Sequence, residues 1–91
     1  MIQIQRSKTF VKHFQKRIAH RQRLSNKCHE RIRLFLEDPM NPVLKNHPLK
    51  QNMQGHYAFS VTGDIRIVYY WASEDVAIFV DIGTHAQIYG M

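Results

Sequence analysis

The sequence predicts an α+β domain, in which a short strand and two helices precede a three-stranded antiparallel meander. Three observations indicate this fold class. Apolar residues recur at steps of three and four between residues 7 and 37, as they do on one face of a helix. From residue 57 onward the pattern changes to β-branched and aromatic runs that turn residues separate. A length of 91 residues suits one domain, which we expect to span residues 1–91.

The first fifty residues are expected to form a strand and an α-hairpin. Residues 2–5, Ile-Gln-Ile-Gln, alternate as a half-buried strand does. Ser7 is expected to cap the first helix and Ser25 the second, because a hydroxyl can accept from the free N–H groups of a first turn. The residue before Pro39 should end the second helix, since that position is disfavoured in the α region. The apolar stripes comprise Phe10, Val11, Phe14 and Ile18, then Leu24, Cys28, Ile32, Phe35 and Leu36.

Residues 38–55 contain all three prolines and few apolar residues, and we expect an irregular loop there. Loops of that length in a small domain are usually functional or disordered. The expected strands follow at Tyr57–Val61, Ile65–Trp71 and Val76–Ile82, joined as hairpins. In the middle strand, alternation places Arg66 on the face opposite to Ile65 and Ile67. Residues 83–91 show no period, and the helices should cover one face of the mainly antiparallel sheet.

Charge is divided between the two halves of the chain. Residues 1–50 hold twelve of the thirteen Lys and Arg against three acids, a net charge of +9. Residues 51–91 hold Arg66 alone against four acids, a net charge of −3. A basic half attracts polyphosphate, because neutralising each phosphate releases a condensed counterion. Nucleic acid is therefore the leading partner, and the alternative is that these charges only solvate two surface helices.

Cysteine content and hydropathy exclude several classes of protein. A single cysteine, Cys28, excludes an internal disulfide, and its helical spacing indicates a core residue. No apolar run approaches the roughly 20 residues of a membrane span. The segment MIQIQRSK lacks the apolar stretch of a signal peptide. We therefore expect a cytoplasmic protein with no membrane association.

Several residues in the C-terminal half could support acid–base chemistry. His47, His56 and His85 fall in loops or at strand ends, where functional residues concentrate, and histidine exchanges protons near neutral pH. Asp64 precedes the strand of Arg66, and the spacing should place both on one side of the sheet; alternatively, Asp64 only stabilises the turn at Thr62-Gly63-Asp64. No ligand spacing typical of zinc is present, so neither a metal nor another cofactor is expected.

Such residues are together what metal-free RNA cleavage requires. A base removes the proton of the 2′-OH, which attacks the adjacent phosphate, and an acid protonates the leaving 5′ oxygen. A cation stabilises the charge of the transition state. An aromatic ring can stack on a splayed base and hold the in-line geometry.

Motifs in residues 47–90 resemble those of the RelE/ParE toxin superfamily. They are His47-Pro48-Leu49-Lys50, then Gly63 to Tyr69 (GDIRIVY), then Gly83 to Gly90 (GTHAQIYG). The closing Gly-Thr-His-Ala, with an aromatic residue before Gly90, is most similar to the YafQ-type branch of RelE mRNA interferases. The order of elements also fits this family over nearly the whole chain.

This resemblance implies the toxin of a type II toxin–antitoxin pair, an endoribonuclease that cuts mRNA in the ribosomal A site without a metal. The family's catalytic positions match His47, Asp64, His85 and Tyr89, and the family arginine matches Arg66. The implied partners are the ribosome, mRNA and an acidic, partly disordered cognate antitoxin, with operator DNA bound only through the antitoxin. The RNA contacts that we expect are Lys8, Lys12, Lys16, Arg17, Arg21, Arg23 and Lys50.

One position departs from the family pattern. A histidine that YafQ-like toxins often carry on the strand before Asp64 corresponds to Ser60 in this chain. His56 is displaced from that position by four residues, about 13 Å along a strand, so its substitution for the missing histidine is open. Arg66 could then carry more of the catalytic load.

Two alternative functions stay open from the sequence. One is a ParE-type toxin, which shares the fold but blocks DNA gyrase and needs no acid–base residues. His47, Asp64 and His85 argue against that alternative. The other is a degenerate toxin that serves only as an antitoxin partner or co-repressor, because intact residues do not prove intact geometry.

Overall fold

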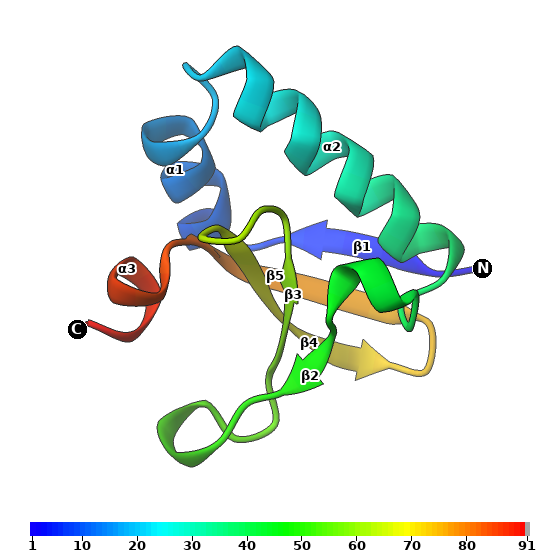
Figure 1. Cartoon of the computed structure of the whole chain (residues 1–91). Coiled ribbons are helices and arrows are strands. Elements are labelled where there is room, and N and C mark those ends of the chain that lie inside the picture. Colours follow the sequence, from blue (N-terminus) through cyan, green and yellow to red (C-terminus); the bar gives the residue numbers. More distant parts are fainter. Residues whose placement is uncertain (91) are drawn as a thin grey trace.

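A five-stranded mixed sheet with the two longer helices on one face forms the core of the protein (Figure 1). The computed structural model describes residues 1–90. The strand order is β1-β5-β4-β3-β2. β1 is parallel to β5, and the other neighbouring pairs are antiparallel, which confirms the predicted α+β class and the C-terminal meander. The strands are β1 (Gln3–Arg6), β2 (His47–Pro48), β3 (Tyr57–Ser60), β4 (Arg66–Ser73) and β5 (Val76–Gly83).

Helix α1 (Lys8–Arg17) begins where the sequence predicts. The Ser7 hydroxyl accepts a hydrogen bond from the backbone N–H of Phe10 at 3.0 Å, which confirms Ser7 as the N-cap. Phe10 and Ile18 are buried, but Val11 is 45% exposed. The inclusion of Val11 in the apolar stripe was therefore wrong, since a residue one position after Phe10 lies about 100° further round the helix.

Helix α2 (Gln22–Glu37) begins four residues earlier than predicted. Its N-cap position is Arg21, which makes no side-chain capping bond, and the Ser25 N–H already donates to the Arg21 carbonyl. Ser25 is thus inside the helix, and its assignment as the cap was wrong. The end before Pro39 is confirmed. No helix in residues 1–90 has both the length and the apolar character that a bilayer crossing requires.

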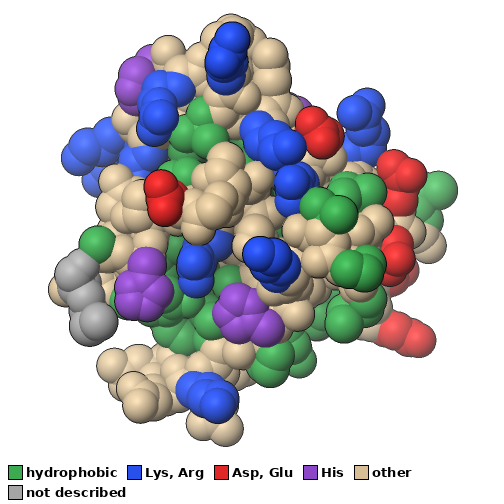
Figure 2. Space-filling model, in the orientation of Figure 1, with side chains coloured by type: hydrophobic (Ala, Val, Ile, Leu, Met, Phe, Trp, Pro, Cys, Tyr) green, Lys and Arg blue, Asp and Glu red, His purple; other side chains and the backbone are tan. Residues whose placement is uncertain are grey.

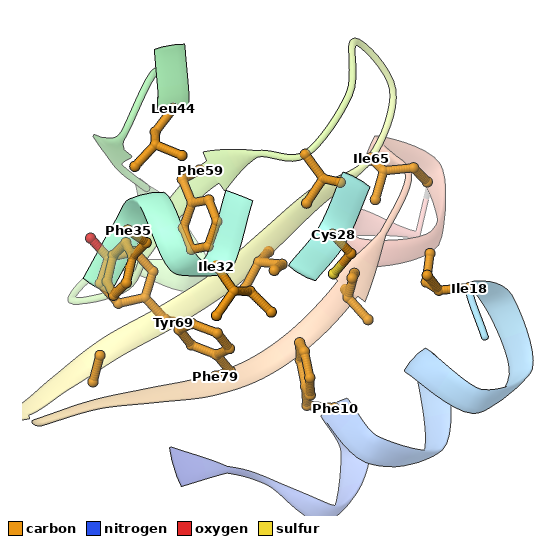
Figure 3. Close-up of a cluster of buried hydrophobic side chains, with 14 of the residues drawn as sticks. Phe10, Ile18, Cys28, Ile32, Phe35, Leu44, Phe59, Ile65, Tyr69 and Phe79 are labelled. Atoms are coloured by element: carbon orange, nitrogen blue, oxygen red, sulfur yellow. The ribbon is translucent and has the colours of Figure 1, made fainter. Parts of the chain in front are cut away.

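Aromatic side chains from α2 and the meander form the core (Figure 3). The Phe35 ring lies 4.8 Å from the Phe59 ring and 4.9 Å from the Tyr69 ring, measured between centroids. Phe79 of β5 completes this cluster. The predicted helix pair is present, but α1 packs mainly on β5 and meets α2 through the rings of Phe14 and His29.

Two segments in which we expected no helix or strand contain short elements. Residues 38–55 hold two 3₁₀ turns, η1 (Pro42–Leu44) and η2 (Gln51–Met53), and the two-residue strand β2. The expectation of a wholly irregular loop was therefore wrong, because two residues are too few to show alternation. Residues 85–89 form helix α3 (His85–Tyr89), which Thr84 and Gln87 begin as a capping box.

Candidate functional site

The register of the sheet places the predicted site residues on the face away from the core. His47 of β2 lies opposite Ala58 of β3, and Ser60 lies opposite Arg66 of β4. Directly opposed residues in antiparallel strands point to the same side of a sheet. His47, Ser60 and Arg66 therefore share one face, while the alternating residues Phe59 and Ile67 point into the core.

An open cleft of about 520 Å³ lies at this face, between the end of the sheet, α3 and the η2 segment. Figure 2 shows histidine and basic side chains around this hollowed part of the surface. Four of the five predicted catalytic residues line the cleft, and so does Lys50 from the predicted RNA contacts. The lining residues are His47, Leu49, Lys50, Gln51, Asn52, Met53, Arg66, His85 and Tyr89.

The His47 ring is oriented by the backbone of its own loop. Its Nδ1 lies 2.9 Å from the carbonyl oxygen of Lys45, which can only accept a hydrogen bond. This contact fits a proton on Nδ1, which leaves Nε2 as the nitrogen without a partner in residues 1–90. Lys45 itself has left-handed backbone angles, with φ of 51°. The turn after η1 thus orients the ring of an exposed histidine.

His85 and Tyr89 lie one turn apart on α3 and form a second wall of the cleft. Their ring centroids are 4.5 Å apart, with the planes tilted by 56°. The capping box fixes the start of this short helix: Thr84 N–H donates to Gln87 Oε1 at 2.8 Å, and Gln87 N–H donates to Thr84 Oγ1 at 3.1 Å. The cap is what positions both side chains.

Arg66 projects from the first position of β4 between Ser60 and Gly83, its neighbours on the flanking strands. Its Nε is buried without a hydrogen-bond partner. Within residues 1–90 its guanidinium takes part in no hydrogen bond or ion pair with the protein. The donors of Arg66 are therefore uncommitted at the edge of the cleft.

The structure does not bring Asp64 into the cleft lining. Asp64 is exposed in the turn after β3, and the bonds that shape this turn go to the Thr62 hydroxyl, which accepts from the N–H groups of Asp64 and Ile65. Among the described residues the Asp64 carboxylate has no bonded partner. Thr62, rather than the Asp64 side chain, stabilises the turn.

His56 does not lie where the family histidine is expected. Its ring packs edge-on against Tyr70, with centroids 5.4 Å apart, and its Nδ1 is buried without a partner. His56 is not in the cleft lining, whereas Ser60 lies directly opposite Arg66. The position of Ser60 is the one from which a side chain could reach the Arg66 guanidinium.

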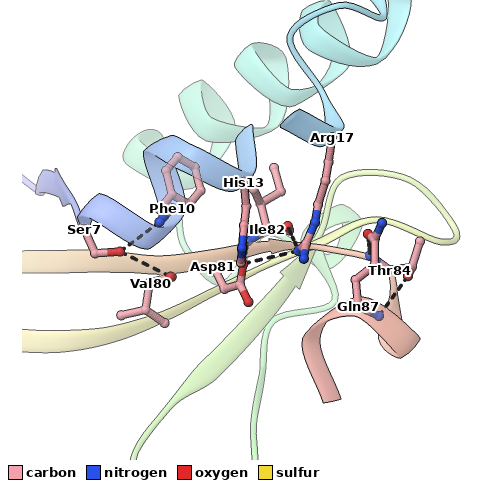
Figure 4. A network of polar contacts seen from close by, with 9 residues as sticks. All are labelled: Ser7, Phe10, His13, Arg17, Val80, Asp81, Ile82, Thr84 and Gln87. Carbon is pink, nitrogen blue, oxygen red and sulfur yellow. Dashed lines mark hydrogen bonds and ion pairs between the residues drawn. The ribbon is translucent and has the colours of Figure 1, made fainter. Parts of the chain in front are cut away.

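The predicted RNA contacts on the helices differ in exposure. Arg17 is held inside the protein: its Nη1 donates to the Ile82 carbonyl at 2.9 Å and lies 3.5 Å from Asp81 Oδ1 (Figure 4). His13 contacts the same carboxylate at 2.6 Å. These contacts attach α1 to β5. The remaining predicted helix residues are all exposed: Lys8, Lys12, Lys16, Arg21 and Arg23.

The sequence reasoning missed the cleft residues of the η2 segment, Gln51, Asn52 and Met53. The length of the loop was the only signal for them. No group of three His, Cys, Asp or Glu in residues 1–90 is arranged to hold a metal ion. The cleft thus offers two imidazoles, an uncommitted guanidinium, an ammonium and a phenol, a set suited to a phosphodiester.

Known proteins similar to this chain share its fold over 92–99% of its length. A family model described as "Bacterial toxin of type II toxin-antitoxin system, YafQ" matches residues 2–90. The crystal structure of YafQ from E. coli strain BL21(DE3) is 27% identical, covers 99% of this chain and 100% of that one, and has a TM-score of 0.78.

Two further solved structures are similar. One is the E. coli DinJ-YafQ complex, with 26% identity, 99% and 100% coverage of the two chains and a TM-score of 0.75. The other is a YoeB/ParE toxin from Agrobacterium tumefaciens, with 20% identity, 92% and 99% coverage and a TM-score of 0.76, a likeness of fold alone. None of the curated protein sequences matches.

Proposed function

The chain belongs to the YafQ family of bacterial toxins of type II toxin–antitoxin systems, and we propose that it is a ribosome-dependent mRNA endoribonuclease. One observation carries the proposal. The cleft gathers His47, His85, Tyr89 and an Arg66 guanidinium whose donors no group in residues 1–90 uses. A toxin that acts by blocking gyrase has no need of two histidines beside a free guanidinium.

The proposed reaction is attack of a ribose 2′-OH on the adjacent phosphate. One histidine removes the proton of the 2′-OH as the new O–P bond forms. The other donates a proton to the 5′ oxygen as its bond to phosphorus breaks, which leaves a cyclic phosphate and a 5′-OH. His47 and His85 share these two parts, and Nε2 is the nitrogen through which His47 acts.

The other residues bind and orient the substrate in this proposal. Arg66 stabilises the charge on the equatorial phosphate oxygens, as a fork of two N–H donors can. Tyr89, held against His85, contacts the base or its phosphate. Asp64 lies outside the cleft lining, in the turn beside β4, so this proposal assigns it no contact with the histidine pair. Lys50 with the exposed helix residues attracts RNA. The chemistry needs no metal.

We further propose that a cognate antitoxin inhibits this protein in the cytoplasm. The E. coli relative is known in a complex with DinJ. An acidic, partly disordered partner suits the basic helices, because a segment that folds on binding can wrap a large charged surface. Contact with operator DNA would then pass through the antitoxin.

The test is cleavage of mRNA on programmed ribosomes with a chelator present throughout. His47→Gln and His85→Gln keep size and polarity but cannot transfer a proton, so each should slow cleavage by about 10²–10⁴-fold. His20→Gln is the matched control, because His20 is exposed at the turn between α1 and α2 and does not line the cleft. The control should cleave at the wild-type rate.

Two results would reject this mechanism. One is full activity of His85→Gln, and the other is loss of wild-type activity on chelation alone. Inhibition of DNA supercoiling by gyrase, without any cleavage of mRNA, would favour the ParE-type alternative. A protein that binds its antitoxin but does neither would be the degenerate toxin.

A further inference from the structure

Basic side chains from three parts of the chain converge on a second pocket, which shares Arg66 with the cleft. This basic pocket has a volume of about 460 Å³. Its cationic residues are Lys27 and Arg31 of α2, Lys45 of the turn after η1 and Arg66 of β4. Ser60 and Thr62 add hydroxyl groups, and none of the described residues that line it is acidic.

The charges of the basic pocket are only weakly compensated by the protein. Among residues 1–90, the one ion pair near this pocket joins Lys27 Nζ to Glu30 Oε1 at 3.9 Å, beyond hydrogen-bond distance and largely solvated. Arg31 Nη1 donates to the Val43 carbonyl at 3.0 Å, which holds the guanidinium in place. Like charges that converge without acids repel one another, and a bound anion removes that repulsion.

The chemistry of the basic pocket fits a phosphodiester. Guanidinium and ammonium groups beside hydroxyls are the usual protein contacts to phosphate and sugar oxygens. Because Arg66 lines both hollows, an anion in the basic pocket lies next to a phosphate at the cleft. Successive phosphates along one nucleic-acid strand are neighbours in the same way.

We propose that the basic pocket binds the RNA phosphate adjacent to the one cleaved. The inference rests on the proposed function, because it assigns a second substrate contact to the same site. It gives the sheet face two phosphate sites in a row, with Arg66 between them. The substrate backbone is then held on both sides of the reacting 2′-OH, which favours the in-line geometry.

The test measures binding of 2′-O-methyl trinucleotides, which cannot be cleaved because the nucleophile is blocked. One probe carries two normal phosphodiester linkages, and two others carry a neutral methylphosphonate at either linkage. Wild-type protein should bind the fully charged probe about tenfold more tightly than either single-phosphate probe, as expected for loss of a charged contact.

The variant Lys27→Gln/Lys45→Asn removes two cations from the basic pocket. Asparagine tolerates the left-handed backbone of Lys45, so the carbonyl that holds His47 should keep its place. In this variant the preference for two phosphates should fall below about twofold, because the second phosphate has lost two of its four cationic partners. Lys27→Gln alone, on a helix surface, should lower the preference partway without touching the loop.

Lys12→Gln/Arg33→Gln is the matched control, with the same loss of charge at exposed helix positions outside both hollows. It should bind all probes more weakly yet keep the tenfold preference. Equal binding of all three probes by wild-type protein, or an unchanged preference in Lys27→Gln/Lys45→Asn, would overturn the inference. Cleavage by His85→Gln would reject the proposed chemistry and leave this binding pattern intact.

Discussion

Two arginines at the same end of the sheet illustrate how contacts, rather than residue type, separate structure from function. Arg17 donates to the Ile82 carbonyl and lies beside Asp81, so its donors are occupied by the protein. Arg66 has no such partner within residues 1–90 and lines the cleft. A guanidinium already bound to carbonyl and carboxylate oxygens has little left for a phosphate.

Arg66→Lys should remove most of the activity although it keeps the charge. An ammonium cannot reproduce the two-pronged contact of a guanidinium, and loss of one donor to a transition-state oxygen costs about 10²-fold or more in rate. Single-turnover cleavage on programmed ribosomes measures the effect. The melting temperature serves as the control and should stay close to wild type, because Arg66 makes no hydrogen bond within residues 1–90 that the change would break. Wild-type cleavage by this variant would remove Arg66 from the mechanism.

Cys28 should be unreactive in the folded protein. Burial among apolar side chains raises the pKa of its thiol from 9.0 to about 12, although the charge of Arg6 opposes the shift. Iodoacetamide at pH 8 should therefore label Cys28 only after denaturant is added, as mass spectrometry can show. Rapid labelling of the native protein would contradict a buried thiol.

The same shift sets a direction for stability at alkaline pH. The folded thiol holds its proton above pH 9.0, where the thiol of the unfolded chain loses it. The unfolded state then binds fewer protons, so the contribution of Cys28 to the free energy of unfolding falls as the pH rises from about 9 toward 12. Below pH 9 this contribution is fully present. Cys28→Ala should flatten that part of the pH profile in urea denaturation.

At the level of elements, α1 completes an edge of the sheet that β1 leaves open. β1 pairs with β5 only as far as Phe79. Beyond it, the Val80 carbonyl accepts from the Ser7 hydroxyl at 3.2 Å and the Ile82 carbonyl accepts from Arg17 (Figure 4). Side chains of α1 thus satisfy backbone groups that an edge strand exposes, which also blunts an aggregation-prone edge.

Gly83 allows a close approach of side chains where this edge meets α3. A Cβ at Gly83 would lie 2.7 Å from both Arg17 Nη1 and Gln87 Oε1, two atoms already engaged in hydrogen bonds. Gly83→Ala should therefore lower the free energy of unfolding by about 1–3 kcal/mol and shift α3, with loss of cleavage. Thermal denaturation measures the first effect.

The control for that prediction is Gly63→Ala, because a Cβ at Gly63 would meet nothing within 4 Å. Its melting temperature should change little. If Gly83→Ala were as stable as Gly63→Ala, the close approach of Arg17 and Gln87 would not be a constraint.

Long elements with a clear period could be predicted from the sequence, and short ones could not. The apolar stripe of α2 extends over four turns, and β4 and β5 alternate over eight residues each. These patterns of buried positions are long enough to predict both the helix and the strands. β2 and α3 have two and five residues, too few for any period to emerge. The capping box of Thr84 and Gln87 was the one local signal for α3 that the sequence carried.

The residues of the candidate site likewise divide into those that could be predicted from the sequence and those that could not. His47, Arg66 and His85 were selected from their residue types and positions, Tyr89 was added by resemblance, and the fold brings these four to one cleft. Asp64 remains outside the lining, because the turn built on Thr62 interrupts the alternation that would place it beside Arg66. The cations of the basic pocket were not selected, since Lys27, Arg31 and Lys45 meet Arg66 only through the packing of α2 and η1 against the sheet.

For the whole molecule, basic side chains are the prevailing charged groups on the face that carries the cleft (Figure 2). Basic side chains cover the helices and surround the cleft, while most acidic side chains visible in Figure 2 lie along one side. An elongated RNA approaching the cleft therefore meets a mainly positive field. Such a field raises the rate of encounter and orients the ligand before contact.

RNA binding should consequently be steeply dependent on salt. The logarithm of the association constant should fall with the logarithm of salt concentration by about 0.7 for each phosphate neutralised on a single strand. Lys12→Glu/Lys16→Glu, two exposed positions one turn apart on α1, should weaken binding and reduce that slope while the melting temperature stays near wild type. Titration of a non-cleavable RNA at several salt concentrations measures both quantities. An affinity that is flat between low and high salt would show that the basic surface only solvates the helices.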